Sequence, residues 1–219
     1  MTPDHKAAAT KAAEMLIKHN IISAPIDPLP ILKSMPGVLV LSFAEMAEKM
    51  CVERSNIISM FGTGNQDAVT TVHVSGENLH YIVAYNQRMP FYMLQRSLAR
   101  ELGHIVLGHD GTRPEDVRTA EAVTFARHFL CPRPLVKSLQ DAGLVITVEM
   151  LGNVTGCYER CLAGIRKSPG VRIPPELNRL IRDQFAPYVE NFVFCQSVLA
   201  GADESAKADF GTFMDLYEE

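Results

Sequence analysis

Apolar residues at helical spacing open the chain. A helix is predicted over Asp4–Asn20, because alanines and larger apolar residues recur three and four positions apart along it. A segment with three prolines follows and must end this helix, since proline interrupts helical hydrogen bonding. A short helical turn is then predicted over Leu29–Ser34. The apolar residues that define the first helix are Ala8, Ala12, Met15 and Leu16.

Short apolar and β-branched runs come next and predict a small sheet. Residues 38–41 read Val-Leu-Val-Leu between a Gly and a Ser, which indicates a buried strand. Residues 43–51 have the pattern of a helix. Spacers rich in Gly, Asn and Ser separate the following runs, so a meander of antiparallel strands is expected. The predicted strands of this meander are Asn56–Phe61, Val69–Val74 and His80–Ala84.

The rest of the chain has mainly helical patterns. A strongly amphipathic helix is predicted from Pro90 to Leu107, with Pro in its first turn, and a second over Glu115–Leu130. Further helices are expected over 134–142, 147–152, 156–166 and 175–185, and an amphipathic one over 203–219, whereas 188–199 is ambiguous. The Pro- and Gly-containing stretch 168–175 is a candidate hinge. The predicted fold is α+β, with a small mixed or antiparallel sheet packed by helices, a domain over residues 1–142 and a mostly helical extension over 143–219.

Composition narrows the function classes. A chain of 219 residues is long enough for one domain with a small appendage. The net charge of −4 gives no electrostatic footprint for a nucleic acid, so direct nucleic-acid binding is not expected. The five cysteines contain no Cys-x-x-Cys pair, which fits reduced thiols rather than a zinc ribbon or a redox motif. Without a signal-peptide pattern or an apolar run of roughly 18 residues, the protein is expected to be cytoplasmic, with no membrane partner.

The helix predicted over 90–107 carries the candidate chemistry. It contains Arg100-Glu101-Leu102-Gly103-His104. In a helical His-Glu-x-x-His motif, two histidines four residues apart bind zinc from one face, and the Glu acts on the metal-bound water as general base. Glu101 and His104 fit the base and second-ligand positions, but Arg100 stands at the first ligand position. A Glu-x-x-His pair by itself is a weak signal, because such pairs arise often by chance and more commonly consist of a surface Glu and a core or capping His.

Several short matches in the right order make the chain resemble the ImmA/IrrE-like family of zinc metallopeptidases over residues 8–140. That family has a helix reading Leu-Ala-His-Glu-Leu-Gly-His, followed by a second Gly-His, which here is 108–109. It also has a ligand-bearing helix that closes in Phe-Ala and a Leu-x-Pro, similar to Glu121–Pro132. The remaining matches are a Pro-Val-Asp-like element at 24–27, a strand ending in Asn at 81–86 and an Arg-containing helix start at 95–97.

The resemblance places the metal ligands and shows two departures. Arg100 replaces the first His, and the acidic third ligand falls at Thr119, although Thr is a poor zinc ligand. Glu121 is a candidate replacement beside His104, but two residues along a helix turn it by about 200°, so it is expected to point elsewhere. His109 and Asp110 are further candidates, with the alternative that both are solvent-facing loop residues.

A guanidinium at a metal position favours carboxylates over cations. Arg100 cannot lose its proton at ordinary pH and pairs well with carboxylates. We therefore expect it beside Glu101 or Glu121, with zinc binding and catalysis impaired or lost. The alternative is an active zinc endopeptidase whose site is completed by other residues.

The resemblance also implies partners. Members of the family cleave helix-turn-helix repressors, so such a repressor is the expected partner, and a member without catalysis would act as a binding protein for a transcriptional regulator. An extended substrate is expected to add beside a sheet edge. The candidate edge strand is 81–86, with Tyr81, Val83 and Tyr85, and an internal strand is the alternative. Residues 148–167 are also compatible with a helix-turn-helix reader of DNA, although a packing role fits the few basic residues better.

Overall fold

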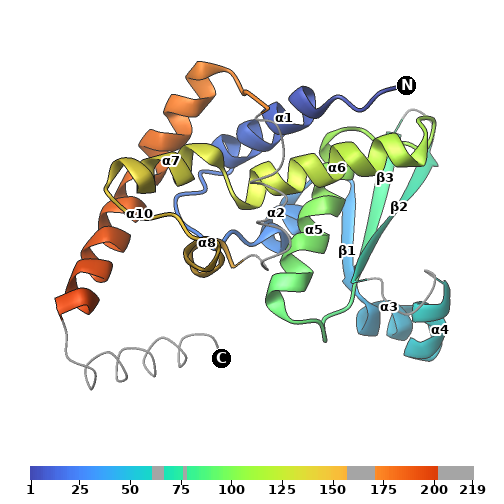
Figure 1. Cartoon of the computed structure of the whole chain (residues 1–219). Coiled ribbons are helices and arrows are strands. Elements are labelled where there is room, and N and C mark those ends of the chain that lie inside the picture. Colours follow the sequence, from blue (N-terminus) through green and yellow to red (C-terminus); the bar gives the residue numbers. More distant parts are fainter. Residues whose placement is uncertain (61–66, 76–77, 157–170, 202–219) are drawn as a thin grey trace.

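Three strands form a mixed sheet in the order β1-β3-β2 (Figure 1). The computed structural model describes residues 1–60, 67–75, 78–156 and 171–201. β1 (Val38–Ser42) runs parallel to β3 (Asn78–Tyr85), and β2 (Ala68–Ser75) runs antiparallel to β3. The predicted α+β class is confirmed. The prediction of 81–86 as an edge strand is wrong, because β3 pairs on both sides and β1 and β2 are the edges.

The first strand predicted for the meander is also wrong. Residues Arg54–Met60 form helix α4, while Phe61 lies outside the described residues. Within α4, Ile57 is fully buried and packs with Phe43, Ala47 and Ala84 in a small core of its own. A seven-residue run with two adjacent isoleucines fits either period, and packing against α3 (Phe43–Met50) decides for the helix.

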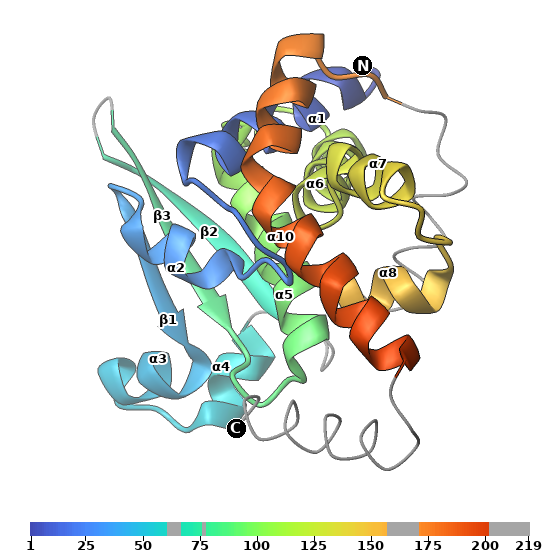
Figure 2. The same cartoon turned by 90° about the vertical axis from the view of Figure 1, so that its left-hand side faces the viewer.

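A layer of helices covers one side of the sheet (Figure 2). Helix α5 (Phe91–Val106) packs against β2 and β3, and α6 (Glu115–Leu130) packs against α5. Helix α1 (His5–Lys18) lies on α6, and α2 (Pro28–Ser34) contacts both α5 and β1. Helix α5, which carries the candidate chemistry, therefore lies between the sheet and the other helices.

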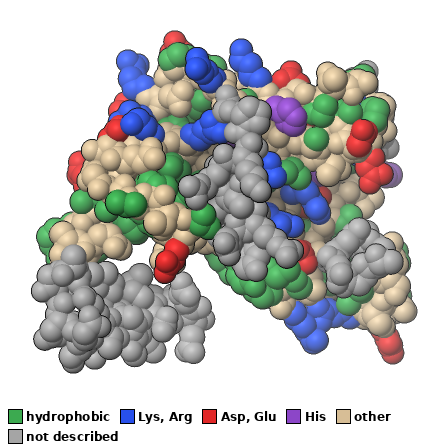
Figure 3. Space-filling view, in the orientation of Figure 1, with side chains coloured by type: hydrophobic (Ala, Val, Ile, Leu, Met, Phe, Trp, Pro, Cys, Tyr) green, Lys and Arg blue, Asp and Glu red, His purple; other side chains and the backbone are tan. Residues whose placement is uncertain are grey.

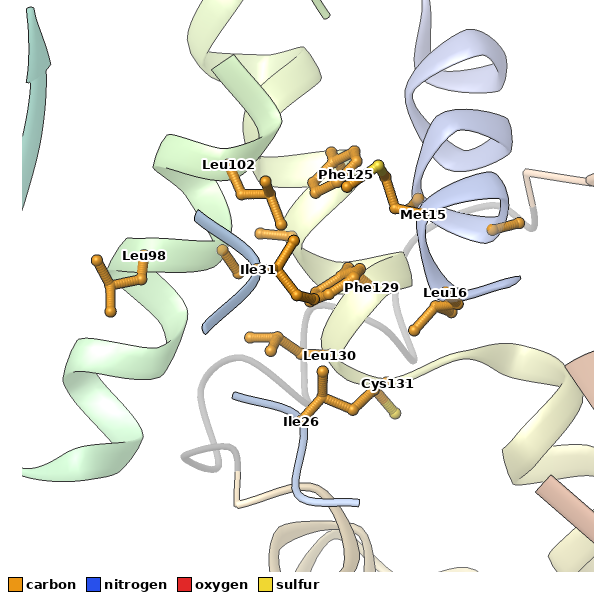
Figure 4. Packing of buried hydrophobic residues seen from close by; sticks show 14 of the residues in the cluster. Met15, Leu16, Ile26, Ile31, Leu98, Leu102, Phe125, Phe129, Leu130 and Cys131 are labelled. Carbon is orange, nitrogen blue, oxygen red and sulfur yellow. The ribbon is translucent and has the colours of Figure 1, made fainter. Parts of the chain in front are cut away.

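The main core fills the space between α5, α6 and α1 (Figure 4). The rings of Phe125 and Phe129 stack with centroids 5.7 Å apart, and both are fully buried. Leu98 and Leu102 of α5 are equally buried. Gly103 brings α5 close to α6, because a Cβ there would lie 3.0 Å from Phe125 Cδ1. This close contact fixes the position of the helix that carries the candidate chemistry.

The described part of the C-terminal extension packs onto the same core. Helix α7 (Arg133–Asp141) is followed by α8 (Val148–Thr155) and by α10 (Pro175–Gly201). Helix α10 lies against α1 and α7 and continues through residues 188–199, whose pattern was ambiguous. It adds Ile181, Phe185 and Val189 to the core. The domain boundary at 142 stays a prediction.

Several predicted features fall on residues that the structure does not describe. The second half of 148–167, residues 168–170 of the candidate hinge and the helix over 203–219 lie outside the described residues. Among those that are described, Cys51 and Cys195 are exposed free thiols, and Cys131 is buried. No helix within the described ranges has the length and apolarity needed to cross a membrane.

Candidate functional site

A cleft of about 360 Å³ lies where α5, α6 and β2 meet. Its walls combine polar side chains of the two helices with one side of the strand. The lining residues of α5 are Arg100, Glu101 and His104, and those of α6 are Glu115, Arg118 and Thr119. The lining residues of β2 are Ala68, Val69, Thr70 and Val72, and His109, which follows α5 in the chain, also lines the cleft.

An ion pair occupies the position of the first ligand. Arg100 donates from Nε and Nη2 to Glu101 Oε1 over 3.1 and 2.8 Å, and from Nη2 to the Ala68 carbonyl oxygen over 3.3 Å. The Arg100 side chain is 36% exposed, whereas that of Glu101 is 5% exposed. Of the two carboxylates that the sequence offered to Arg100, the guanidinium pairs with Glu101. Burial raises the pKa of Glu101 above its ordinary value, although the charge and hydrogen bonds of Arg100 act in the opposite direction.

The second ligand position, His104, is bonded to another histidine. His104 Nδ1 lies 2.9 Å from His109 Nδ1, and the two rings meet edge to face with centroids 5.0 Å apart. Gly108 makes this contact possible, because its φ of 65° turns the chain back at the end of α5. The His109 amide then donates to the His104 carbonyl oxygen over 3.0 Å.

Glu121 anchors the other side of His109. The carboxylate accepts from His109 Nε2 over 3.0 Å, from Arg113 Nη1 over 2.8 Å and from the Asp4 amide over 2.8 Å. Glu121 and His109 are each 2% exposed. Burial by itself raises the pKa of Glu121, but the three donors outweigh it and leave that pKa below its ordinary value.

The hydrogen bonds assign the tautomers of both rings. Because Glu121 is an acceptor, the proton between it and His109 sits on His109 Nε2, and His109 Nδ1 of the neutral ring accepts. His104 must then donate from Nδ1, which leaves the lone pair on its Nε2. Burial, together with the charges of His109, Arg100 and Arg118, lowers the pKa of His104 to about 4, and burial also lowers the pKa of His109. Both rings are therefore neutral near pH 7.

The other candidate ligands lie in three different settings. Thr119 is exposed and lines the cleft, as expected for the position of the missing acidic ligand. Glu121 lies behind His109 and does not line the cleft. Asp110 is exposed and accepts hydrogen bonds from Thr112, as expected for a loop residue, but the same expectation for His109 is wrong.

The residues of this cleft do not fit a zinc ion. Catalytic zinc normally takes three protein ligands, and no group of three or more His, Cys, Asp or Glu side chains in the described residues is arranged to hold a metal. His104 Nε2 is one ligand atom, but Glu101 is paired with Arg100 and Glu121 already accepts three hydrogen bonds. A guanidinium beside a divalent cation would add repulsion of about 4 kcal/mol per pair of unit charges at 4 Å.

Sequence reasoning missed the interior half of this network. The second Gly-His was the available signal for His109, because a left-handed Gly that ends a helix turns the next residue back toward the last turn. The Asp4 amide had no such signal, since it lies 117 residues from Glu121 in the chain.

Comparisons with known proteins give the relationship. Residues 57–146 match the model of the IrrE N-terminal-like domain, a peptidase family. The matched segment includes α5, α6, β2 and every side chain that lines the cleft. Among curated proteins, no match to the chain is found. Over residues 57–146 the chain is therefore similar to the IrrE N-terminal-like domain, and this match supports its resemblance to the ImmA/IrrE-like family of metallopeptidases.

Proposed function

We propose that this protein has lost the zinc binding and peptide hydrolysis of its family and acts by binding a partner protein. One observation carries the proposal: the guanidinium of Arg100 is bonded to Glu101 at the place of the first metal ligand. The charge and hydrogen bonds of Arg100 lower the proton affinity of Glu101 and so oppose its role as a general base. The proposed partner is a helix-turn-helix repressor, the class of substrate that the family resemblance implies.

Two further contacts support the loss of zinc. Glu121, the nearest alternative carboxylate, is committed to His109, Arg113 and the Asp4 amide. Releasing it toward the cleft would leave the buried His109 N–H without an acceptor, at a cost of roughly 1–3 kcal/mol. Thr119, which does line the cleft, has no charge to offer a metal.

Zinc content tests the proposal directly. The purified protein, dialysed against zinc and then against buffer, is expected to carry far less than one zinc per chain by elemental analysis. The double variant Arg100→His, Thr119→Glu should gain zinc, because both changed side chains line the cleft with His104. Arg179→His, an exposed change on α10, is the matched control for a new surface histidine. One zinc per chain in the unchanged protein would refute the loss.

Hydrolysis gives an independent test. No cleavage of a quenched fluorescent peptide is expected from the unchanged protein above that of its Glu101→Gln variant. Cleavage that disappears with a chelator and with Glu101→Gln would instead establish an active endopeptidase with a rearranged site.

The partner role rests on the free side of β2. Among the described strands, β2 pairs only with β3, and its residues Ala68, Val69, Thr70 and Val72 line the cleft. An extended segment of a partner can add to such an edge through main-chain hydrogen bonds. A candidate helix-turn-helix repressor should therefore slow amide hydrogen exchange in residues 68–75. Protection confined to other segments would contradict this mode of binding.

A further inference from the structure

We propose that the cleft between α5, α6 and β2 binds a carboxylate carried by an extended peptide. The inference deepens the proposed function and rests on it, since it requires that no zinc ion fills the cleft. It names the chemistry that a partner would present to the site: an acidic side chain or a free C-terminal carboxylate.

Two arginines with unused donors face this cleft. Arg100 uses Nε and Nη2 for its contacts with Glu101 and the Ala68 carbonyl oxygen, which leaves Nη1 without a protein acceptor among the described residues. Arg118 donates from Nε to the Arg113 carbonyl oxygen over 3.0 Å. In the described part of the chain, no carboxylate lies within 4.0 Å of the Arg118 guanidinium. Both side chains line the cleft, and basic side chains gather on the face over α5 and α6 (Figure 3).

The acidic groups around the cleft leave this positive charge largely unbalanced. Glu101 is buried and already balances Arg100, and Glu121 lies behind His109 beside Arg113. Glu115, in the first turn of α6, is the one acidic lining residue that is exposed to solvent among those described. Arg118 is therefore available to an incoming anion.

The donor geometry favours a carboxylate. Guanidinium groups present pairs of N–H donors that match the two oxygens of a carboxylate, and such charge-assisted bonds are stronger than neutral ones. Thr119, which is exposed, adds a hydroxyl group on the α6 wall of the same cleft. A metal cation would meet repulsion from both arginines at this place, whereas an anion would be attracted.

The sheet edge explains why the carboxylate would belong to a peptide. A strand added along β2 would place alternate side chains on the side that Ala68, Thr70 and Val72 occupy. One of these side chains would then lie beside Arg100 and Arg118. Main-chain pairing would supply affinity independent of sequence, and the arginines would select an acidic residue at one position.

Matched peptides test the preference on the full chain. The probes are fluorescein-labelled octapeptides of alternating Thr and Val with an amidated C-terminus and either Glu or Gln at one central position. Fluorescence anisotropy should show the Glu peptide binding at least about tenfold more tightly than the Gln peptide, and the preference should weaken as salt is raised. A third probe, the Gln peptide with a free C-terminal carboxylate, distinguishes the two sources: tight binding would assign the site to a chain terminus as well.

Variants assign the preference to the cleft. Arg118→Gln should reduce the Glu-to-Gln ratio to about twofold or less, and Arg118→Lys should leave an intermediate ratio because it keeps the charge and loses the paired donors. Arg179→Gln makes the same charge change on the exposed side of α10 and should leave the ratio unchanged. Circular dichroism and thermal unfolding of each variant check that the fold is retained.

The outcomes separate this inference from the proposed function. Equal affinity for the Glu and Gln peptides, no measurable binding of the Glu peptide, or a ratio unaffected by Arg118→Gln would overturn the carboxylate site. Zinc content is measured on the same preparations. A zinc-free protein without a Glu preference would refute the carboxylate site alone, whereas one zinc per chain would refute the proposed function itself.

Discussion

Glu121→Gln is the most informative single change in the buried network. Oε1 of the carboxylate accepts a hydrogen bond from the Asp4 amide, and Oε2 accepts from both His109 and Arg113. A glutamine keeps the shape but has one oxygen and one NH₂ group. Whichever way the amide is oriented, its NH₂ group must face at least one N–H donor that had an acceptor before.

The cost follows from which donor is lost. With the NH₂ group toward Asp4, one partly buried amide loses its acceptor. With the NH₂ group toward His109, the fully buried ring N–H and Arg113 lose theirs. An unsatisfied buried donor costs roughly 1–3 kcal/mol, so Glu121→Gln should lower the free energy of unfolding by about 2 kcal/mol. Arg113→Gln should cost less than about 1 kcal/mol, since the Arg113 side chain is 36% exposed and its pair is partly solvated.

Urea unfolding at pH 7, followed by far-ultraviolet circular dichroism, measures both changes. Glu190→Gln, an exposed isosteric change on α10, is the control and should stay within about 0.5 kcal/mol of the unchanged protein. The slope of unfolding free energy with urea should be the same for all variants, which licenses the comparison of midpoints. A loss below about 0.5 kcal/mol for Glu121→Gln, outside the roughly 1–3 kcal/mol range of an unsatisfied buried donor, would refute the reasoning. So would an equal loss for Arg113→Gln.

Two further predictions concern packing and pH. Gly103→Ala should lower the free energy of unfolding, measured from the urea midpoint, by about 1–3 kcal/mol. Its new Cβ would lie 3.0 Å from the buried Phe125 ring and 3.2 Å from the Ala122 carbonyl oxygen. A variant as stable as the unchanged protein would contradict this close contact between α5 and α6. Burial, reinforced by two neighbouring arginine charges, lowers the pKa of His128 from 6.5 to about 4. Between pH 6.5 and about 4, His128 is therefore protonated in the unfolded chain but neutral in the folded protein. The free energy of unfolding should fall as pH decreases through this range, by up to about 3 kcal/mol from this group. His128→Gln should flatten that part of the stability profile, and an unchanged profile would contradict the assignment.

The long periodic segments made most of the helices predictable. The helix predicted over Asp4–Asn20 is α1, and Glu115–Leu130 coincides with α6. The strand predicted over residues 56–61 was wrong because a short run with adjacent isoleucines fits the period of a helix as well as that of a strand. Burial of Ile57 against α3 decides for the helix. The place of β3 in the sheet was beyond the sequence pattern as well. It depends on parallel pairing with β1, and that partner lies before α3, α4 and β2 in the chain.

The candidate site, too, was predictable only in part from the sequence. The charge of Arg100 predicted a carboxylate partner, either Glu101 or Glu121, and the structure pairs it with Glu101. The arrangement around His109 depends on the turn at Gly108 and on a backbone amide from the start of α1, and neither is visible in a helical pattern. Local chemistry was therefore readable, whereas contacts that close the site from distant segments were not.

The persistence of Glu101 and His104 does not by itself indicate a metal enzyme. Glu101 is 4% exposed and balances the charge of Arg100, so removing it would leave a guanidinium without its carboxylate. His104 is bonded to His109, and through Glu121 this chain of hydrogen bonds ties α5 to α6 and to the start of α1. Both residues thus have a role in stability that is independent of zinc. Arg100, Arg118 and Thr119 also line the cleft, and under the proposed function these are the residues that a bound partner would contact.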